Sequence, residues 1–68
     1  MATLTKKQKY IIRAFADNDM NVSETARNLF CHRNTITYHL EKIYEDTGLD
    51  PRNFYDLVTL LSMIGEEK

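Results

Sequence analysis

Apolar residues recur along the chain at intervals of three, four and seven, which is the period of amphipathic helices. The repeating sets are Ile11, Ile12 and Phe15; Val22, Ala26 and Leu29; Ile36, Leu40 and Ile43; and Phe54, Leu57, Leu61 and Ile64. No stretch alternates apolar and polar residues for long enough to suggest a strand. The pattern therefore predicts helices over residues 6–17, 22–29, 33–47 and 52–64, and an all-α, four-helix fold without a wing.

Capping residues stand at the predicted helix ends. Thr5 and Gln8 have the spacing of a capping box, in which each side chain binds the other residue's free backbone N–H. Asn21 and Glu24 repeat this spacing before the second helix. Gly48 follows the third helix, where it can take the left-handed conformation that ends many helices. These residues predict where the first three helices begin or end.

The fourth helix has two possible starts. Pro51 suits a first helical position with Asp50 as its cap, whereas Asn53 and Asp56 offer a later start. This helix is apolar over a wider arc than the others, which indicates either deep burial or a contact with another chain. For the second alternative, the expected homodimer interface consists of Val58, Leu60, Leu61 and Ile64.

The second and third predicted helices are separated only by residues 30–32. Ala26 is small enough for two helices to cross closely, and Cys31 supplies a small apolar group in the turn. A short helix, a tight turn and a second, longer helix are the spacing of a helix-turn-helix. The alternative is a plain helical hairpin, and we favour the helix-turn-helix.

The outer face of the third helix is unusual for a merely solvated surface. If its apolar residues face inward, the outer positions are Arg33, Asn34, Thr37, Tyr38 and Glu41. Asn, Thr and Tyr are weaker helix formers than the Lys, Glu and Gln that usually cover such a face. Their side chains can hydrogen-bond to base edges and phosphates. The pattern favours a DNA-reading surface over a tolerated polar one.

Composition limits the class of protein. A chain of 68 residues allows one domain with a small core. The single cysteine excludes an internal disulfide and a site with several thiolate ligands. No apolar run approaches the roughly 20 residues of a membrane span, and the N-terminus lacks the apolar core of a signal peptide. We therefore expect a cytoplasmic protein with no membrane partner.

Charge is distributed unevenly although the net charge is only −1. Residues 1–42 contain seven basic and four acidic residues, a net +3, whereas residues 43–68 contain two basic and six acidic residues, a net −4. The first part could face phosphates while the second faces water or a partner. An ordinary mixed surface is the alternative.

The stretch NVSETARNLFCHRNTITYHLEKIYEDTGLD, residues 21–50, resembles the C-terminal helix-turn-helix of PucR-type transcription regulators. The shared pattern is N-V-S-E-T-A, then L-F, H-R-N-T, L-x-x-I and T-G-L-D. The flanks LTKKQKYIIRAF and HLEKIY and the apolar fourth helix are more similar to the LuxR/GerE-type output domain. The chain departs from the PucR pattern at His39, where the family usually carries an arginine. It also carries no large N-terminal sensory region, so the resemblance leaves an excised output domain or a small stand-alone protein as alternatives.

The resemblance implies sequence-specific binding to double-stranded DNA in bacterial-type transcriptional regulation. The third helix would be the recognition helix, and the expected base-reading residues are Arg33, Asn34, Thr37 and Tyr38. The expected phosphate contacts are Ser23, Thr25, Arg27, His32, Thr35 and Lys42. Lys6 and Lys7 would add attraction that does not depend on base sequence.

Two other functions remain to be weighed. A protein-interaction module could use the same fold without DNA, and the acidic second half favours it. An enzyme or metal site is the other, because His32 and His39 lie seven residues apart near Cys31. Zinc sites need three or four ligands, and the chain offers neither a nucleophile with its base nor a phosphate-binding glycine loop. We therefore predict no catalysis, metal or cofactor.

Overall fold

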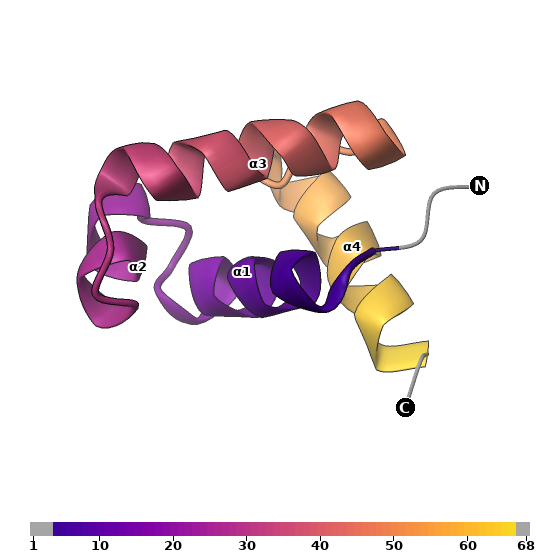
Figure 1. Ribbon diagram of the computed structural model, residues 1–68. Coiled ribbons are helices and arrows are strands. Elements are labelled where there is room, and N and C mark those ends of the chain that lie inside the picture. Colours follow the sequence, from indigo (N-terminus) through magenta and orange to yellow (C-terminus); the bar gives the residue numbers. More distant parts are fainter. Residues whose placement is uncertain (1–3, 67–68) are drawn as a thin grey trace.

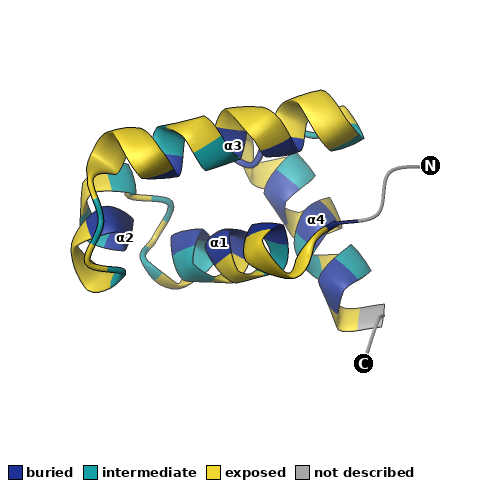
Figure 2. Ribbon diagram, viewed as in Figure 1, coloured by how far each residue is buried: buried dark blue, intermediate teal, exposed yellow. Residues whose placement is uncertain are grey.

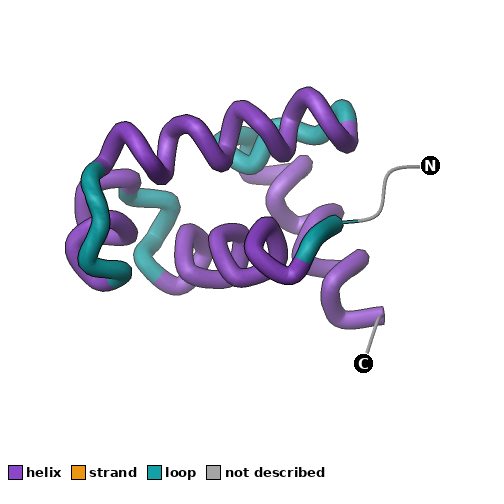
Figure 3. Tube along the Cα trace, in the orientation of Figure 1, coloured by secondary structure: helices purple, strands orange, loops and turns teal. Residues whose placement is uncertain are grey.

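The computed structural model describes residues 4–66, with no side-chain description for Glu66. Within that range the chain forms four helices and no strand (Figures 1 and 3): α1 (Lys6–Asp17), α2 (Val22–Asn28), α3 (Arg33–Thr47) and α4 (Phe54–Glu66). The all-α, four-helix prediction is confirmed. Helix α2 ends one residue earlier than expected, and α4 is displaced by two residues toward the C-terminus.

The two longest-range helix contacts hold α1 between α3 and α4. Helices α1 and α3 lie side by side and run in opposite directions, α2 packs against α3, and α4 crosses the other end of the molecule against α1 (Figure 1). The amide of Gln8, in the first turn of α1, donates a hydrogen bond to the Asp46 carboxylate in the last turn of α3 (2.8 Å). The outer side of α3 is therefore left uncovered along its length (Figure 2).

The core is formed by the inward stripes that the sequence predicts. Its buried apolar residues are Leu4, Ile11, Ile12, Phe15, Ala26, Ile36, Leu40, Ile43, Leu57, Leu60 and Ile64. Each fully buried leucine or isoleucine contributes about 1.5–3 kcal/mol relative to an exposed position. Because α3 contributes three of these residues, its orientation is fixed by the core along three turns.

Local hydrogen bonds account for the helix ends. The Thr5 and Gln8 capping box is present, with both reciprocal bonds at 3.0 Å. The Asn21 side chain accepts a bond from the Glu24 N–H at 2.9 Å. Gly48 has a φ of +78°, and its N–H donates to the Tyr44 carbonyl at the end of α3. These three sequence predictions are confirmed.

Of the two possible starts for α4, the later one is correct. The Asn53 side chain accepts a hydrogen bond from the Asp56 N–H (3.2 Å), and its carbonyl accepts the bond from the Leu57 N–H. Asp50 instead caps a separate turn, because its carboxylate accepts from the Arg52 N–H (2.9 Å). The turn between residues 50 and 53 therefore precedes α4.

Two residues of the predicted homodimer interface belong to the core. Leu60 and Ile64 are buried, because they share the inner stripe of α4 with Leu57 at spacings of three, four and seven. Their assignment to an intermolecular surface is corrected. Val58 is 48% exposed and Leu61 is partly buried, so these two residues remain available at the surface.

Candidate nucleic-acid interface

Helices α2 and α3 are joined by a tight turn that is closed by backbone hydrogen bonds. The Cys31 N–H donates to the Ala26 carbonyl (3.0 Å), and the Phe30 N–H donates to the Arg27 carbonyl (3.2 Å). Ala26 is buried at the helix contact, as its small size predicts. The geometry is that of a helix-turn-helix, with a seven-residue α2 and a fifteen-residue α3.

Phe30 is a feature of this turn that the sequence analysis did not anticipate. Its φ is +57°, and its side chain is 97% exposed. A bulky residue in the left-handed region is uncommon, and nothing in the sequence marks this one. The two backbone bonds on either side hold the conformation, so the turn is defined by its hydrogen bonds and not by a glycine.

His32 is the N-cap of α3. Its Nδ1 accepts a hydrogen bond from the Asn34 N–H (3.1 Å), which satisfies one of the free donors at the helix start. With Nδ1 as acceptor, Nε2 is the ring nitrogen that carries the proton in the neutral imidazole. His32 is exposed, so Nε2–H is available to an acceptor outside the chain. The sequence suggested a phosphate contact here but not the cap.

The predicted base-reading residues lie on the uncovered side of α3. Arg33 and Asn34 are exposed, and neither side chain has a partner among the described residues. Tyr38 is 60% exposed, and its ring makes an edge contact with His39 at a centroid distance of 5.4 Å. Thr37 is partly exposed and donates its hydroxyl proton to the Arg33 carbonyl (3.2 Å), which leaves its oxygen as an acceptor.

The predicted phosphate-contact residues divide into available and unavailable side chains. Ser23 and Thr35, near the starts of α2 and α3, are exposed. Thr25 is fully buried, and its hydroxyl donates to the Asn21 carbonyl (2.7 Å). Its assignment to a phosphate contact is corrected, because it stands beside Ala26 on the inner side of α2. Arg27 is exposed but pairs with Glu24 at 2.8 Å.

A second basic region lies where α1 meets α3. Lys42 approaches Asp46 at 3.9 Å, and Gln8 holds the other oxygen of that carboxylate. Partial burial, and then the Lys7 ammonium, lower the pKa of His39 below its usual 6.5. The start of α1 therefore brings positive charge to the side of α3. The sequence analysis missed the contact between Gln8 and Asp46 because the capping box already gave Gln8 a partner within α1.

Two features searched for in the described part of the chain are absent. Between residues 4 and 66, no three His, Cys, Asp or Glu side chains gather in an arrangement that could hold a metal ion. None of the helices formed by these residues is long and apolar enough to cross a bilayer.

Comparison with known proteins gives an independent line of evidence. Residues 11–64 match the family described as the PucR C-terminal helix-turn-helix domain. The match extends from α1 to α4, so it includes the helix-turn-helix and the two helices that support it.

Two curated proteins are similar to shorter parts of the chain. An uncharacterized protein of Bacillus subtilis (strain 168), YxkF, is 37% identical over 43 residues, which are 63% of this chain and 14% of that protein. The carbohydrate diacid regulator of Escherichia coli (strain K12) is 53% identical over 36 residues, which are 53% of this chain and 9% of the regulator. The chain thus corresponds to a small fraction of either relative. No solved structure matches the chain significantly.

Proposed function

Since the chain belongs to the family of PucR C-terminal helix-turn-helix domains, we propose that it binds double-stranded DNA sequence-specifically in transcriptional regulation, with α3 as its recognition helix. The regulator from Escherichia coli is similar to the chain over the helix-turn-helix itself, which supports a regulatory role. We place this activity in the cytoplasm. Any signal sensing would belong to a further region of the kind that PucR-type regulators carry N-terminal to this domain.

The exposed first two turns of α3 are the observation that carries the proposal. They present Arg33, Asn34, Thr37 and Tyr38 from a helix whose opposite side is fixed in the core. The major groove of B-DNA admits an α-helix, and its base edges offer donors and acceptors in distinct patterns. Side chains held on a rigid helix can match such a pattern with little loss of conformational entropy.

We assign a separate role to each side chain that reaches a base. Arg33 pairs bidentately with a guanine through its two terminal nitrogens, and Asn34 pairs with an adenine. Both side chains are free of partners in the described chain, so no internal hydrogen bond has to break. Thr37 and Tyr38, one turn further along α3, read or position the next bases.

Phosphate contacts would surround this surface. His32 donates through Nε2, while Ser23 and Thr35 offer hydroxyl groups near the starts of α2 and α3. Free backbone N–H groups at these helix starts favour the same anions. Thr25 supports the site only indirectly, through its bond to the Asn21 carbonyl.

Charge at the α1–α3 junction would add attraction at longer range. Lys7 and Lys42 bring ammonium groups beside α3, and Arg27 can exchange Glu24 for a phosphate because this pair is exposed. The acidic residues after position 43 would then face away from DNA. A surface of this kind predicts affinity that falls as the salt concentration rises.

In-vitro selection from a random duplex library tests the proposal directly. We expect one recurring motif, and binding to it that weakens by at least tenfold between 50 and 200 mM salt, as expected for several phosphate contacts. Failure to enrich any duplex, with no binding at 50 mM salt, would contradict the proposal. That result would favour the second candidate, a protein-interaction module, which the sequence pI of about 6.0 supports.

A further inference from the structure

The outer face of α4 carries no charge in its central part. No charged residue occurs between positions 57 and 65, although 28% of the whole chain is charged. Several of these uncharged residues are nevertheless exposed, namely Val58, Thr59, Ser62 and Gly65. Two aromatic residues extend the same face, since Phe54 is 61% and Tyr55 is 78% exposed. Absence of charge combined with exposed aromatic rings is the composition of the central part of a protein interface.

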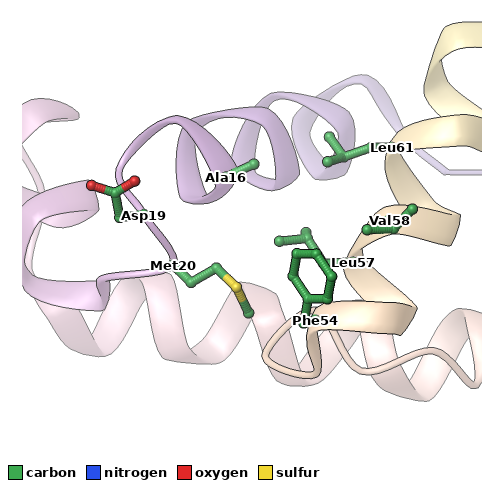
Figure 4. Close-up of a pocket in the computed structure, with 7 residues that line it drawn as sticks. All are labelled: Ala16, Asp19, Met20, Phe54, Leu57, Val58 and Leu61. Atoms are coloured by element: carbon green, nitrogen blue, oxygen red, sulfur yellow. The ribbon is translucent and has the colours of Figure 1, made fainter.

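An apolar groove runs along one edge of this face. It has a volume of about 390 Å³ and lies between α4 and the end of α1 (Figure 4). Its residues are Ala16, Asp19, Met20, Phe54, Leu57, Val58 and Leu61. A second hollow, bounded by Arg13, Asp17 and Gly65, shares Ala16 and Leu61 with the first. The two hollows therefore form one continuous depression with charged residues at its rim.

The wall formed by Met20 is built into the backbone. The Met20 N–H donates to the Phe15 carbonyl (2.9 Å), and the Asp19 N–H donates to the Ala16 carbonyl (3.2 Å). These bonds define a Schellman motif, in which the residue at the second position after the cap packs back on the helix. Asp19 and Met20 are both left-handed, with φ values of +56° and +61°. The groove is thus a fixed feature of the surface.

We propose that this face binds a second copy of the chain, with the two α4 helices packed antiparallel about a twofold axis. The occupant is indicated by the size of the side chains along α4. Its first turn carries the bulky Phe54 and Tyr55, whereas Ser62 and Gly65 near its end are small. A twofold axis lays the bulky end of each helix over the small end of the other, so the same surface is complementary to itself.

The second hollow receives the aromatic ring in this arrangement. It is bordered by Gly65, where an added Cβ would meet no atom within 4 Å, and its rim holds Arg13 and Asp17. Tyr55 of the second copy would enter the hollow with its ring on Leu61 and its hydroxyl near these charged groups. A parallel arrangement would instead stack aromatic ends on each other and leave the small ends unfilled.

The size of the face sets the strength of the contact. Aromatic side chains bury about 150–250 Å² each, so the exposed parts of Phe54, Tyr55 and Val58 offer on the order of 300 Å² per copy. Stable complexes bury about 1,200–2,000 Å² in total. The free chain is therefore a weak dimer, and association becomes effective when two copies occupy neighbouring DNA sites. Only this last step rests on the proposed function.

Cysteine cross-linking tests the geometry without DNA. In a Cys31→Ala background, the twofold axis passes between positions 55 and 62, so Val58→Cys should form a disulfide with its own copy. Tyr55→Cys alone and Ser62→Cys alone should not, because each lies about 10 Å along the helix from its own symmetry mate, and disulfides need Cβ atoms about 4 Å apart. A mixture of these two variants should cross-link. Tyr44→Cys, at an exposed position on α3, is the matched control.

The pattern of cross-links decides the outcome. Cross-linking by Val58→Cys and by the mixture, and not by the single variants or Tyr44→Cys, supports the antiparallel dimer. Equal cross-linking at all positions, or none at millimolar concentration, would overturn it. Self-linking of Tyr55→Cys without linking to Ser62→Cys would indicate parallel helices and would also contradict the proposal.

A second measurement separates this inference from DNA binding itself. On a duplex with two neighbouring copies of the selected motif, Val58→Glu should abolish cooperative binding and leave affinity for one copy within twofold of the parent chain. Cooperativity that is unchanged in Val58→Glu would overturn the interface. If the parent chain bound no single motif, the proposed function would fail, while the cross-linking result would stand.

Discussion

The outer faces of α3 and α4 are both exposed, and they differ in the chemistry they present. Helix α3 displays Arg33, Asn34 and Thr37, which offer hydrogen-bonding groups. Helix α4 displays Val58 and Tyr55 with no charge in its central turns. Neither face resembles the Lys- and Glu-rich surface of a helix that only meets water. The difference teaches that the atoms left exposed identify the kind of partner: polar groups for a nucleic acid, and apolar groups for a second protein.

The inner faces of these helices, by contrast, are nearly interchangeable. Each is an aliphatic stripe at spacings of three, four and seven, and each is buried in the same core. A substitution in the core should therefore impair both surfaces together, whereas substitutions outside should separate them. The predictions below use this contrast, beginning with the largest effect.

Leu40→Ala should lower the free energy of unfolding by about 2–5 kcal/mol, because it removes a fully buried side chain at the centre of α3. Urea denaturation followed by circular dichroism measures the change. For a domain this small, the loss should abolish both DNA binding and self-association at 37 °C. Tyr38→Ala, two residues away and exposed, should change stability by less than about 0.5 kcal/mol. Equal effects of the two substitutions would contradict the orientation of α3.

Arg33→Ala should weaken binding to the selected motif by about 1–3 kcal/mol and relax specificity at one base pair. Its stability should not change, because the side chain has no partner in the described chain. Fluorescence anisotropy with cognate and single-substituted duplexes measures both effects. Arg52→Ala, in the turn before α4, is the matched control and should bind normally. Equal weakening on cognate and random duplexes would show that Arg33 contacts only phosphate.

The sequence could predict the fold because each helix carries its own short-range signals. The stripe of Ile36, Leu40 and Ile43 and the caps at Asn21 and Gly48 act within one or two turns, and all five are where the pattern puts them. Such signals need no knowledge of how the helices pack. For this reason the bounds of α1 and α3 match the expected ones.

The sequence could not predict the features that depend on packing between helices. The arc of apolar residues on α4 was too wide to show which side faces α1, so Leu60 and Ile64 were assigned to the surface. Thr25 looked like a polar contact residue, but α2 turns its hydroxyl inward to the Asn21 carbonyl. The left-handed Phe30 depends on hydrogen bonds that close the turn. None of these facts leaves a periodic trace in one sequence.

Gly48→Ala tests whether the end of α3 depends on glycine. A residue with a Cβ in the left-handed conformation costs about 1–2 kcal/mol, and Gly48 has a φ of +78° with no neighbour within 4 Å of an added Cβ. We therefore expect a loss of about 1 kcal/mol from backbone strain alone, measured by thermal unfolding. Gly48→Asn, which tolerates this conformation better, should lose less. Equal losses would point to a steric cause that the structure does not contain.

Titration of His39 gives the smallest effect and examines the boundary of the DNA-facing surface. Partial burial and then Lys7 lower the pKa of His39 in the folded chain below 6.5, so the unfolded chain binds the proton more tightly. The stabilising contribution of neutral His39 is therefore complete above pH 6.5, and it is lost as the pH falls toward the folded pKa. NMR titration of the ring protons should show a higher pKa in Lys7→Gln, while His32 serves as an internal reference. An unchanged His39 pKa in that variant would mean that Lys7 does not act on the ring.

The same titration with the selected duplex extends the comparison between faces. A phosphate near the α1–α3 junction would favour the charged imidazole and raise the pKa of His39 relative to the free chain. Binding would then take up a proton, and affinity would increase as the pH falls from 7.5 to 6. If the pKa is the same with and without DNA, the contact is confined to the first turns of α3, and Lys7 acts only at long range. Either result locates the edge of the polar face, where the surface that meets DNA gives way to the rest of the molecule.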